Sequence, residues 1–328
     1  MTMSKPMRRC LYCYKGLEES QEDFHPVCSH VMFGTLIPPT LSLSNEELEE
    51  MGREIVSKSV AIAGVQPKLS LTIQANPDDP KKSRLTIVGM DMPGADKNYQ
   101  FILKPQTEIY PHLPENEDLT MHLADISGIT TAKHSLLRAD TGQLAYITRR
   151  FDRSKGRKIP MEDFCQLMEK QSSGNSKYES SMEKLGKAIK QYSSVPGVDV
   201  IKYFEMTVFS FLVGNSDMHL KNFSIIKDED NQYRLSPAYD LVSSNLAMPD
   251  DKEQMALTMN ARKNKIKRKD FQALASTLQI PASTVEIILS KYSGYIKSYE
   301  ELISISFLPD DLKEQYISLV QQRAKDIE

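Results

Sequence analysis

The spacing of apolar residues changes near residue 162, and this change constrains the fold more than any other feature of the chain. Before it, Leu69, Leu71 and Ile73 alternate with polar residues, which is typical of a strand with one buried face. Further strand-like stretches lie at 84–90, 99–105, 133–140 and 144–153, and a stretch with helical spacing lies at 114–129. The first half therefore predicts a mainly antiparallel sheet with at least one helix against it.

Helical spacing dominates after residue 162, at 161–170, 178–192, 200–213 and in three or four segments after 268. The one interruption is 217–245, where two short strand-like runs flank an Asp-Glu-Asp-Asn turn and predict a hairpin. We therefore expect an α+β fold with a small β-rich lobe at 1–160 and a larger, all-helical lobe at 161–328. The hairpin is set into the second lobe, and a connector lies near 160–166.

Composition limits the classes of protein that fit. The 328 residues are 40% hydrophobic and 26% charged, as in globular proteins with a core. No apolar run is long enough to span a membrane, and the N-terminus lacks an apolar signal core, which favours a cytoplasmic protein. The formal net charge of −3 gives no general attraction to nucleic acid. A basic run at 261–271 is either a solvated face or a contact with nucleic acid or a protein partner.

Three of the four cysteines lie close together near the N-terminus. The order Cys10-x2-Cys13-x11-His25-x2-Cys28 supplies two short-spaced pairs of ligands, which is the spacing that a tetrahedral zinc site uses. The alternative is that a small N-terminal subdomain buries them, because free cysteine packs as a small hydrophobic residue.

Polar residues with the spacing of a phosphoryl-transfer site surround the predicted hairpin. Asp217 precedes Asn222 by five residues, and Asp240 follows at the far end of the hairpin. Phosphoryl transfer needs one acid for the attacking hydroxyl, and an amide oxygen and a second carboxylate to hold Mg²⁺. Asp-x4-Asn alone occurs often by chance, and an isolated His219 is more often structural than catalytic.

The β-rich lobe contains candidate groups for the phosphates of a nucleotide. Lys104 ends a predicted strand, and Glu117, on the helix that follows, could hold it by an ion pair. The loop at 61–68 includes Ala63, Gly64 and Val65, whose backbone N–H groups could cover phosphates together with Lys68. Taken alone, Lys104 could simply keep a strand edge soluble. The loop at 61–68 is also weaker evidence for phosphate binding than a Gly-rich loop would be.

The chain resembles the C-terminal kinase portion of the HipA family of bacterial serine/threonine-protein kinase toxins. The matching stretches are GVQPKLSL, FILKP, NEDLTMHLADISGI, YITRRFDR, KIPMEDFCQL, GNSDMHLKNFSII and LSPAYDLVSS. The resemblance implies a protein-kinase-like two-lobe fold that uses ATP and Mg²⁺ on protein substrates, with aminoacyl-tRNA synthetases as the known targets of the family.

The resemblance also implies roles for individual residues. Asp217 becomes the catalytic acid with His219 beside it, and Asn222 and Asp240 become metal ligands. The same matching makes Lys104 and Lys68 ligands of the nucleotide phosphates, and places backbone contacts to adenine at Glu162 and Phe164.

Two departures from the family pattern are informative. The chain opens at CLYCYKGL, which resembles the short HipT-type toxins, where a small HipS-like protein supplies the N-terminal subdomain and a HipB-like helix-turn-helix antitoxin is the other partner. Contact with DNA would then be indirect, through the antitoxin. The loop SKSVAIAG carries Ala61 and Ala63 where the family has an autophosphorylated serine, which leaves Ser57 and Ser59 as acceptors, unless the alanines were engineered.

Two other functions remain open from the sequence. One is a catalytically silent kinase-fold binding module in a complex with antitoxin and DNA, for which the basic run is the best support. The clustered carboxylates count against it, because they repel each other without a cation. The other is a small-molecule phosphotransferase, which would use the same residues.

Overall fold

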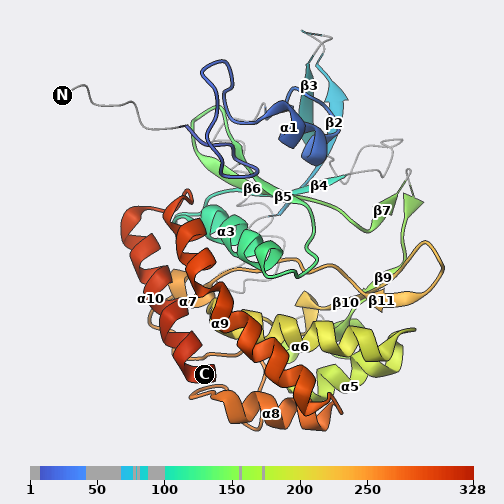
Figure 1. Ribbon diagram of the computed structural model, residues 1–328. Coiled ribbons are helices and arrows are strands. Elements are labelled where there is room, and N and C mark those ends of the chain that lie inside the picture. Colours follow the sequence, from blue (N-terminus) through green and yellow to red (C-terminus); the bar gives the residue numbers. More distant parts are fainter. Residues whose placement is uncertain are drawn as a thin grey trace. The chain divides into compact units, whose positions relative to one another are not determined.

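The computed structural model describes residues 8–41, 68–76, 79, 82–87, 100–154, 157–171 and 174–328. The chain divides into two compact units (Figure 1). Unit 1 comprises residues 1–118 and 132–157, and unit 2 comprises residues 119–131 and 158–328. The predicted phosphate loop at 63–65 and the acceptor candidates Ser57 and Ser59 lie outside the described residues.

A six-stranded sheet forms the framework of unit 1. Its strand order is β1-β3-β2-β4-β6-β5, and every neighbouring pair is antiparallel except β1 with β3. The strands are β1 (Thr40–Leu41), β2 (Leu69–Ala75), β3 (Ser83–Ile87), β4 (Phe101–Lys104), β5 (His134–Arg138) and β6 (Leu144–Arg149). The mainly antiparallel sheet expected from the sequence is confirmed.

Alternation in β2 explains how the sheet buries one face. Leu69 and Leu71 are almost completely buried, whereas Ser70 and Thr72, which each follow one of them, are partly exposed. Phe101 and Leu103 of β4 pair with Leu71 and Leu69, so apolar side chains of neighbouring strands meet on the same face. The helix α1 (Pro26–Phe33) adds Phe33, whose ring centroid lies 5.8 Å from that of Phe101.

The predicted helix near 114–129 is present as α3 (Leu113–Ile126), and the division between the units falls within it. Its C-terminal part belongs to unit 2, where two tyrosine hydroxyls hold it. Thr120 shares a hydrogen bond of 2.8 Å with Tyr316, and Ser127, the residue directly after the helix, shares one with Tyr299. These contacts fasten α3 to α9 (Ala282–Ser304) and α10 (Asp310–Ile327).

Unit 2 is mostly helical, as the sequence predicted. Its helices are α4 (Phe164–Leu167), α5 (Met182–Tyr192), α6 (Pro196–Leu212), α7 (Ser244–Ala247), α8 (Arg268–Thr277), α9 and α10, with 3₁₀ turns η1 (Gly174–Tyr178) and η2 (Leu220–Asn222). The centre of the unit is α6, whose residues from Tyr203 to Leu212 are nearly all buried. Phe211 and Phe204 of this helix both pack against Phe271 of α8.

The predicted hairpin is also present, as β10 (Ser224–Lys227) and β11 (Tyr233–Leu235). The connector contributes a third strand that the sequence did not predict, β9 (Met161–Asp163), which pairs antiparallel with β10. A short pair, β7 (Arg153–Ser154) and β8 (Arg157–Lys158), precedes it in the chain. Among the described residues, no helix combines the length and the apolar character needed to cross a bilayer.

A tight turn at Gly214 ends α6 and begins the segment that carries Asp217. Gly214 has a φ of +69°, in the left-handed region where side chains are strained. A Cβ atom there would lie 2.6 Å from Leu319 Cδ2 of α10 and 3.3 Å from Ser243 Oγ. Backbone geometry and close packing therefore both require glycine.

Replacing Gly214 by alanine is expected to lower the free energy of unfolding by about 2 kcal/mol or more, because strain and overlap act together. Gly294 provides a matched control, since it lies in α9 and a Cβ atom added to it would meet no other atom within 4 Å. Gly294→Ala should instead stabilise the protein by about 0.5–1 kcal/mol through helix propensity. Urea unfolding of both variants measures the difference, and equal effects would contradict the assignment.

Candidate active site

Asp217 lies just beyond the Gly214 turn and is held by a residue that the sequence did not single out. The hydroxyl of Tyr178, at the end of η1, donates a hydrogen bond of 2.6 Å to Asp217 Oδ1. Burial and the nearby Asp217 carboxylate raise the pKa of Tyr178, so this hydroxyl keeps its proton and acts as a donor. Asp217 is itself partly exposed, which leaves its other oxygen available for chemistry.

His219 is buried beside the same tyrosine, with the two rings edge to face and their centroids 5.2 Å apart. Burial lowers the pKa of His219 to about 4, although the carboxylates of Asp217 and Asp240 act in the opposite direction. The imidazole is therefore neutral near pH 7. Among the described residues, its Nδ1 atom has no hydrogen-bond partner.

Asn222 closes the loop onto His219. Its Oδ1 atom accepts the backbone N–H of His219 at 3.1 Å, and its own backbone N–H donates to the His219 carbonyl at 3.0 Å. These two bonds fix both the η2 turn and the direction of the side chain. An amide oxygen has two lone pairs, so Oδ1 can still coordinate a cation.

Asp240 follows the hairpin and has an uncommon backbone conformation, with a φ of +55°. The preceding residue, Tyr239, ties this position to the other end of the hairpin. Its hydroxyl contacts the Lys221 carbonyl at 2.8 Å and Ser224 Oγ at 2.5 Å. The hairpin therefore brings Asp240 back to the loop that carries Asn222.

A second set of contacts braces the Asp217 loop from the segment after Asp240. Ser244 Oγ accepts the backbone N–H of Ser216 at 2.7 Å and lies 3.3 Å from the Gly214 carbonyl. The Asn245 side chain also donates to Ser216 Oγ, and accepts from Arg323 of α10 at 3.0 Å. The stretch LSPAYDLVSS contains Ser244, but no periodicity or motif chemistry marks this serine as a brace.

In unit 1, Lys104 and Glu117 form the ion pair that the sequence predicted. Lys104 Nζ lies 2.5 Å from Glu117 Oε1, and the two side chains are only 4% and 2% exposed. Tyr146, which is paired with Lys104 across β4 and β6, places its ring centroid 5.3 Å from the ammonium. The pair is thus desolvated and held from two directions.

The residue after Glu117 anchors the same part of α3. Asp118 is completely buried, and each of its carboxylate oxygens has a partner. Tyr14 donates to Oδ2 at 2.8 Å, and His134 Nδ1 lies 2.7 Å from Oδ1. Lys68, by contrast, is exposed directly before β2.

The predicted contacts of Glu162 and Phe164 with adenine would use backbone groups, and some of these groups already have partners in the protein. The Phe164 N–H donates to the Phe223 carbonyl at 3.0 Å, and the Lys227 N–H donates to the Pro160 carbonyl at 3.0 Å. Hydrogen-bonded pairs alternate along antiparallel strands, so the backbone of Glu162, opposite Ile225, also faces β10.

Met161 and Asp163 consequently direct their backbone groups away from β10. Because β9 is the edge strand of this three-stranded sheet, these groups lie on the side away from β10, where the Asp163 N–H donates to Gln166 Oε1 at 3.3 Å. A strand of three residues shows no register in the sequence, and the register decides which backbone groups point outward.

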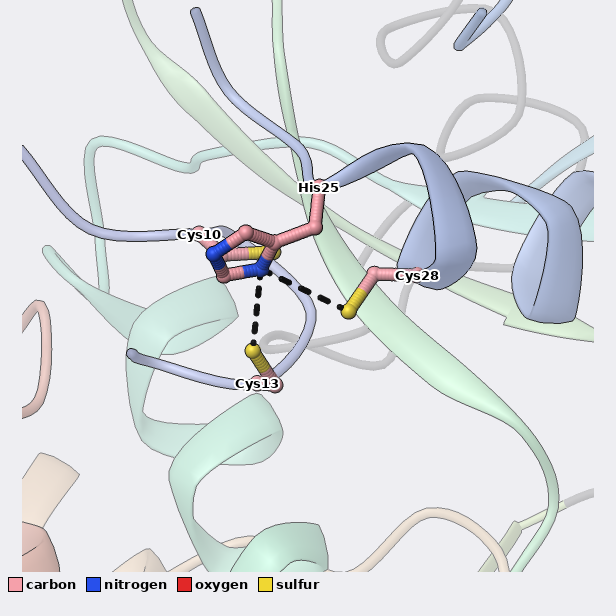
Figure 2. Close-up of side chains that lie close together, drawn as sticks. All are labelled: Cys10, Cys13, His25 and Cys28. Atoms are coloured by element: carbon pink, nitrogen blue, oxygen red, sulfur yellow. Dashed lines mark hydrogen bonds between the residues drawn. The ribbon is translucent and has the colours of Figure 1, made fainter. Parts of the chain in front are cut away.

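The four N-terminal candidates for zinc lie together in unit 1. Figure 2 shows the side chains of Cys10, Cys13, His25 and Cys28 converging. One ligand atom from each lies within 4.8 Å of the other three. The predicted cluster is therefore present as a geometric arrangement.

Sequence similarity to known proteins shows the family to which the chain belongs. A family model described as the HipA-like C-terminal domain matches residues 60–298, most of the chain. The chain belongs to this family. The match covers α3, the hairpin and most of the helices of unit 2.

The individual relatives of this HipA-like chain have low sequence identity to it. A Haemophilus influenzae protein named as a candidate kinase is 29% identical over 62% of this chain and 58% of its own length. The serine/threonine-protein kinase toxin HipA of Shewanella oneidensis is 27% identical over 61% of this chain and 47% of its own length. The chain therefore spans about half the length of the curated relatives it matches.

A solved structure gives the same fold. In the complex of Shewanella oneidensis HipA with HipB and operator DNA, the matching chain has a TM-score of 0.64 and 21% identity. The match covers 81% of this chain and 65% of that one. The α+β, kinase-like fold predicted from the sequence is confirmed at this level.

The buried pair in the HipA-like unit 1 gives a stability prediction. Lys104→Met should destabilise the protein by about 3–5 kcal/mol, because it removes the cation that is paired with the buried Glu117 carboxylate. The double variant Lys104→Met/Glu117→Leu should lose much less than the sum of the two single variants. Thermal and urea unfolding of the three variants complete the cycle.

The surface pair Lys313–Asp310 is the matched control, because the Asp310 side chain is 94% exposed. Lys313→Met should change the free energy of unfolding by about 1 kcal/mol or less. If Lys104→Met lowered the free energy of unfolding as little as this control does, the Lys104–Glu117 pair would not be desolvated and tightly held.

Proposed function

We propose that this protein is an ATP- and Mg²⁺-dependent protein serine/threonine kinase. The observation that carries the proposal is the loop around Asp217 and Asn222, which the hairpin connects to Asp240. One acid, one amide oxygen and a second acid are the groups that phosphoryl transfer requires. Membership of the HipA-like family and the names of its relatives support the same activity.

In this proposal, Asp217 accepts the proton of the attacking hydroxyl while Tyr178 holds one of its oxygens in place. Neutral His219 packs against Tyr178 and supports the loop. Asn222 and Asp240 would hold Mg²⁺, a hard cation that prefers oxygen ligands. The residues fit such an ion, because the Asn222 side chain is fixed by the His219 N–H and keeps a second lone pair on Oδ1. The ion, when bound, would neutralise charge on the phosphates.

The groups of unit 1 would act on the nucleotide. Lys104, fixed by Glu117, would bind phosphates as a point charge. Lys68 and the backbone of Ala63, Gly64 and Val65 are proposed to cover the phosphates, and free backbone groups of the segment 161–164, which contains Glu162 and Phe164, are proposed to contact adenine.

Substrate and partners follow from the family alone and form part of the proposal. The Shewanella HipA structure contains HipB and DNA, so a HipB-like antitoxin is the expected partner here. Three further points stay predictions. The first is action as a toxin on a translation protein such as an aminoacyl-tRNA synthetase. The others are the short HipT-type form with a HipS-like partner, and autophosphorylation at Ser57 or Ser59. Phosphorylation of cell extract followed by mass spectrometry would identify the acceptor protein and residue. Turnover with small molecules but with no protein would favour the phosphotransferase alternative.

The basic run, which is the best support for the binding-module alternative, contains six cations, and acidic side chains partly neutralise it. Three cations of the basic run have acidic partners: Lys263 with Glu253, Lys267 with Asp326, and Arg268 with Glu286. Their charge is thus partly neutralised within unit 2. A silent module would bind ATP without turnover, which separates it from a kinase.

Asp217→Asn and Asp240→Asn are each expected to lower ATP-dependent phosphate incorporation by about 10²-fold or more, through loss of the base and of a metal ligand respectively. Asparagine tolerates the left-handed backbone at position 240, so the fold should survive. Asp230→Asn, an exposed acid in the hairpin turn, is the control and should retain activity. Wild-type rates in the first two variants would exclude the proposal.

Tyr178→Phe tests positioning of Asp217 without changing charge. Loss of a hydrogen bond to a carboxylate costs about 1.5–3 kcal/mol, so kcat should fall about tenfold or more. KM for ATP should stay unchanged, because Tyr178 is assigned to the base and not to the nucleotide. A raised KM with unaltered kcat would assign the tyrosine a different role.

A further inference from the structure

The N-terminal segment of unit 1 folds back on itself around a cluster of soft ligands. A bridge between Arg9 and Gly16 closes a tight turn, in which the Cys10 N–H donates to the Lys15 carbonyl at 2.8 Å. This turn carries Cys10 and Cys13. The other two ligands come from the start of α1, where His25 occupies the N-cap position and Cys28 lies in the first turn.

The orientation of His25 is set by a hydrogen bond on the far side of its ring. Nε2 lies 3.0 Å from the Gly16 carbonyl, and because a carbonyl oxygen only accepts, Nε2 carries the proton. The Nδ1 lone pair then faces the sulfurs of Cys13 at 3.5 Å and Cys28 at 3.7 Å (Figure 2). A backbone carbonyl bound to the remote nitrogen is the usual support for a metal-ligating histidine.

These separations match the edges of a tetrahedral zinc site. With bonds of about 2.3 Å to sulfur and 2.0 Å to nitrogen, tetrahedral geometry places ligand atoms roughly 3.5–3.8 Å apart. All four ligand atoms here lie within 4.8 Å of one another. We propose that Cys10, Cys13, His25 and Cys28 bind a single structural zinc ion.

The composition of the site argues for a structural role. Four protein ligands fill the tetrahedral positions and leave none open for water or substrate. Three thiolates and one imidazole favour zinc over hard cations such as Mg²⁺. Simple burial of thiols explains this arrangement poorly, because only Cys10 of the four is fully buried.

The ion would fasten the N-terminal segment to the sheet. The carbonyl of Leu11, between two ligands, accepts the backbone N–H of Leu136 at 3.2 Å and Ser135 Oγ at 3.1 Å on edge strand β5. Tyr14, directly after Cys13, donates to Asp118 in α3. Residues 8–25 form no helix or extended strand of their own, so a metal would supply the crosslink that regular backbone hydrogen bonding does not.

The test uses the full chain purified under reducing conditions without a metal-binding tag. Elemental analysis by mass spectrometry should find about one zinc per chain, and chelation should lower the melting temperature. Cobalt added to the metal-free protein should give the thiolate charge-transfer bands and the intense visible bands of a tetrahedral Cys₃His site, saturating at one equivalent. The Cys10→Ser/Cys13→Ser double variant should lose the zinc and its melting temperature should not respond to chelator.

Cys165→Ser is the matched control, because Cys165 lies in unit 2 with its Sγ 3.5 Å from the Gln171 carbonyl, and it should keep full zinc content. The cobalt spectrum of wild-type protein decides the question even if the double variant does not fold. Reduced wild-type protein that takes up neither zinc nor cobalt would overturn the proposal. So would zinc retained in the folded double variant, or a disulfide among Cys10, Cys13 and Cys28 in protein purified under reducing conditions.

Discussion

The completely buried carboxylate of Asp118 is the constraint on which the described part of unit 1 depends. A buried charge is tolerated only when its oxygens are paired, and here the partners come from the N-terminal segment, through Tyr14, and from β5, through His134. Both contacts hold the same residue of α3 in place. Glu117, one residue earlier, then reaches Lys104. The N-terminal turn therefore contributes to the geometry of the lysine, although it lies far from Lys104 in the sequence.

In unit 2, uncharged groups rather than charged ones supply the hydrogen bonds that hold the loop of Asp217. The turn at Gly214 leaves backbone groups without helical partners, and Ser244 supplies both a donor and an acceptor to them. The backbone N–H of Asn245 donates to the Gly214 carbonyl at 3.0 Å. Because the segment 243–245 follows Asp240 closely, one set of hydrogen bonds fixes both the loop of Asp217 and the segment after the hairpin.

Regular patterns in the sequence predicted the regular parts of the protein. Alternation at Leu69 and Leu71 identified β2, and the spacing of Lys104 and Glu117 identified an ion pair, because a strand end and a following helix are local features. Tyr178 and Ser244 were missed, since they act through contacts with residues 39 and 28 positions away. The register of β9 was missed for a similar reason: a strand of three residues has no periodicity of its own, and β10 decides which way its backbone faces.

The backbone of Asp240 offers an independent argument about the hairpin. A left-handed conformation costs an aspartate of the order of 1 kcal/mol, which glycine would avoid. Strained residues of this kind persist where the surrounding contacts over-determine them, and they gather at functional sites. Tyr239, locked between Lys221 and Ser224, supplies such contacts. A carboxylate at a position where glycine would be less strained agrees with the role of metal ligand that we propose for Asp240, although eight other non-glycine residues of the described chain also have a positive φ.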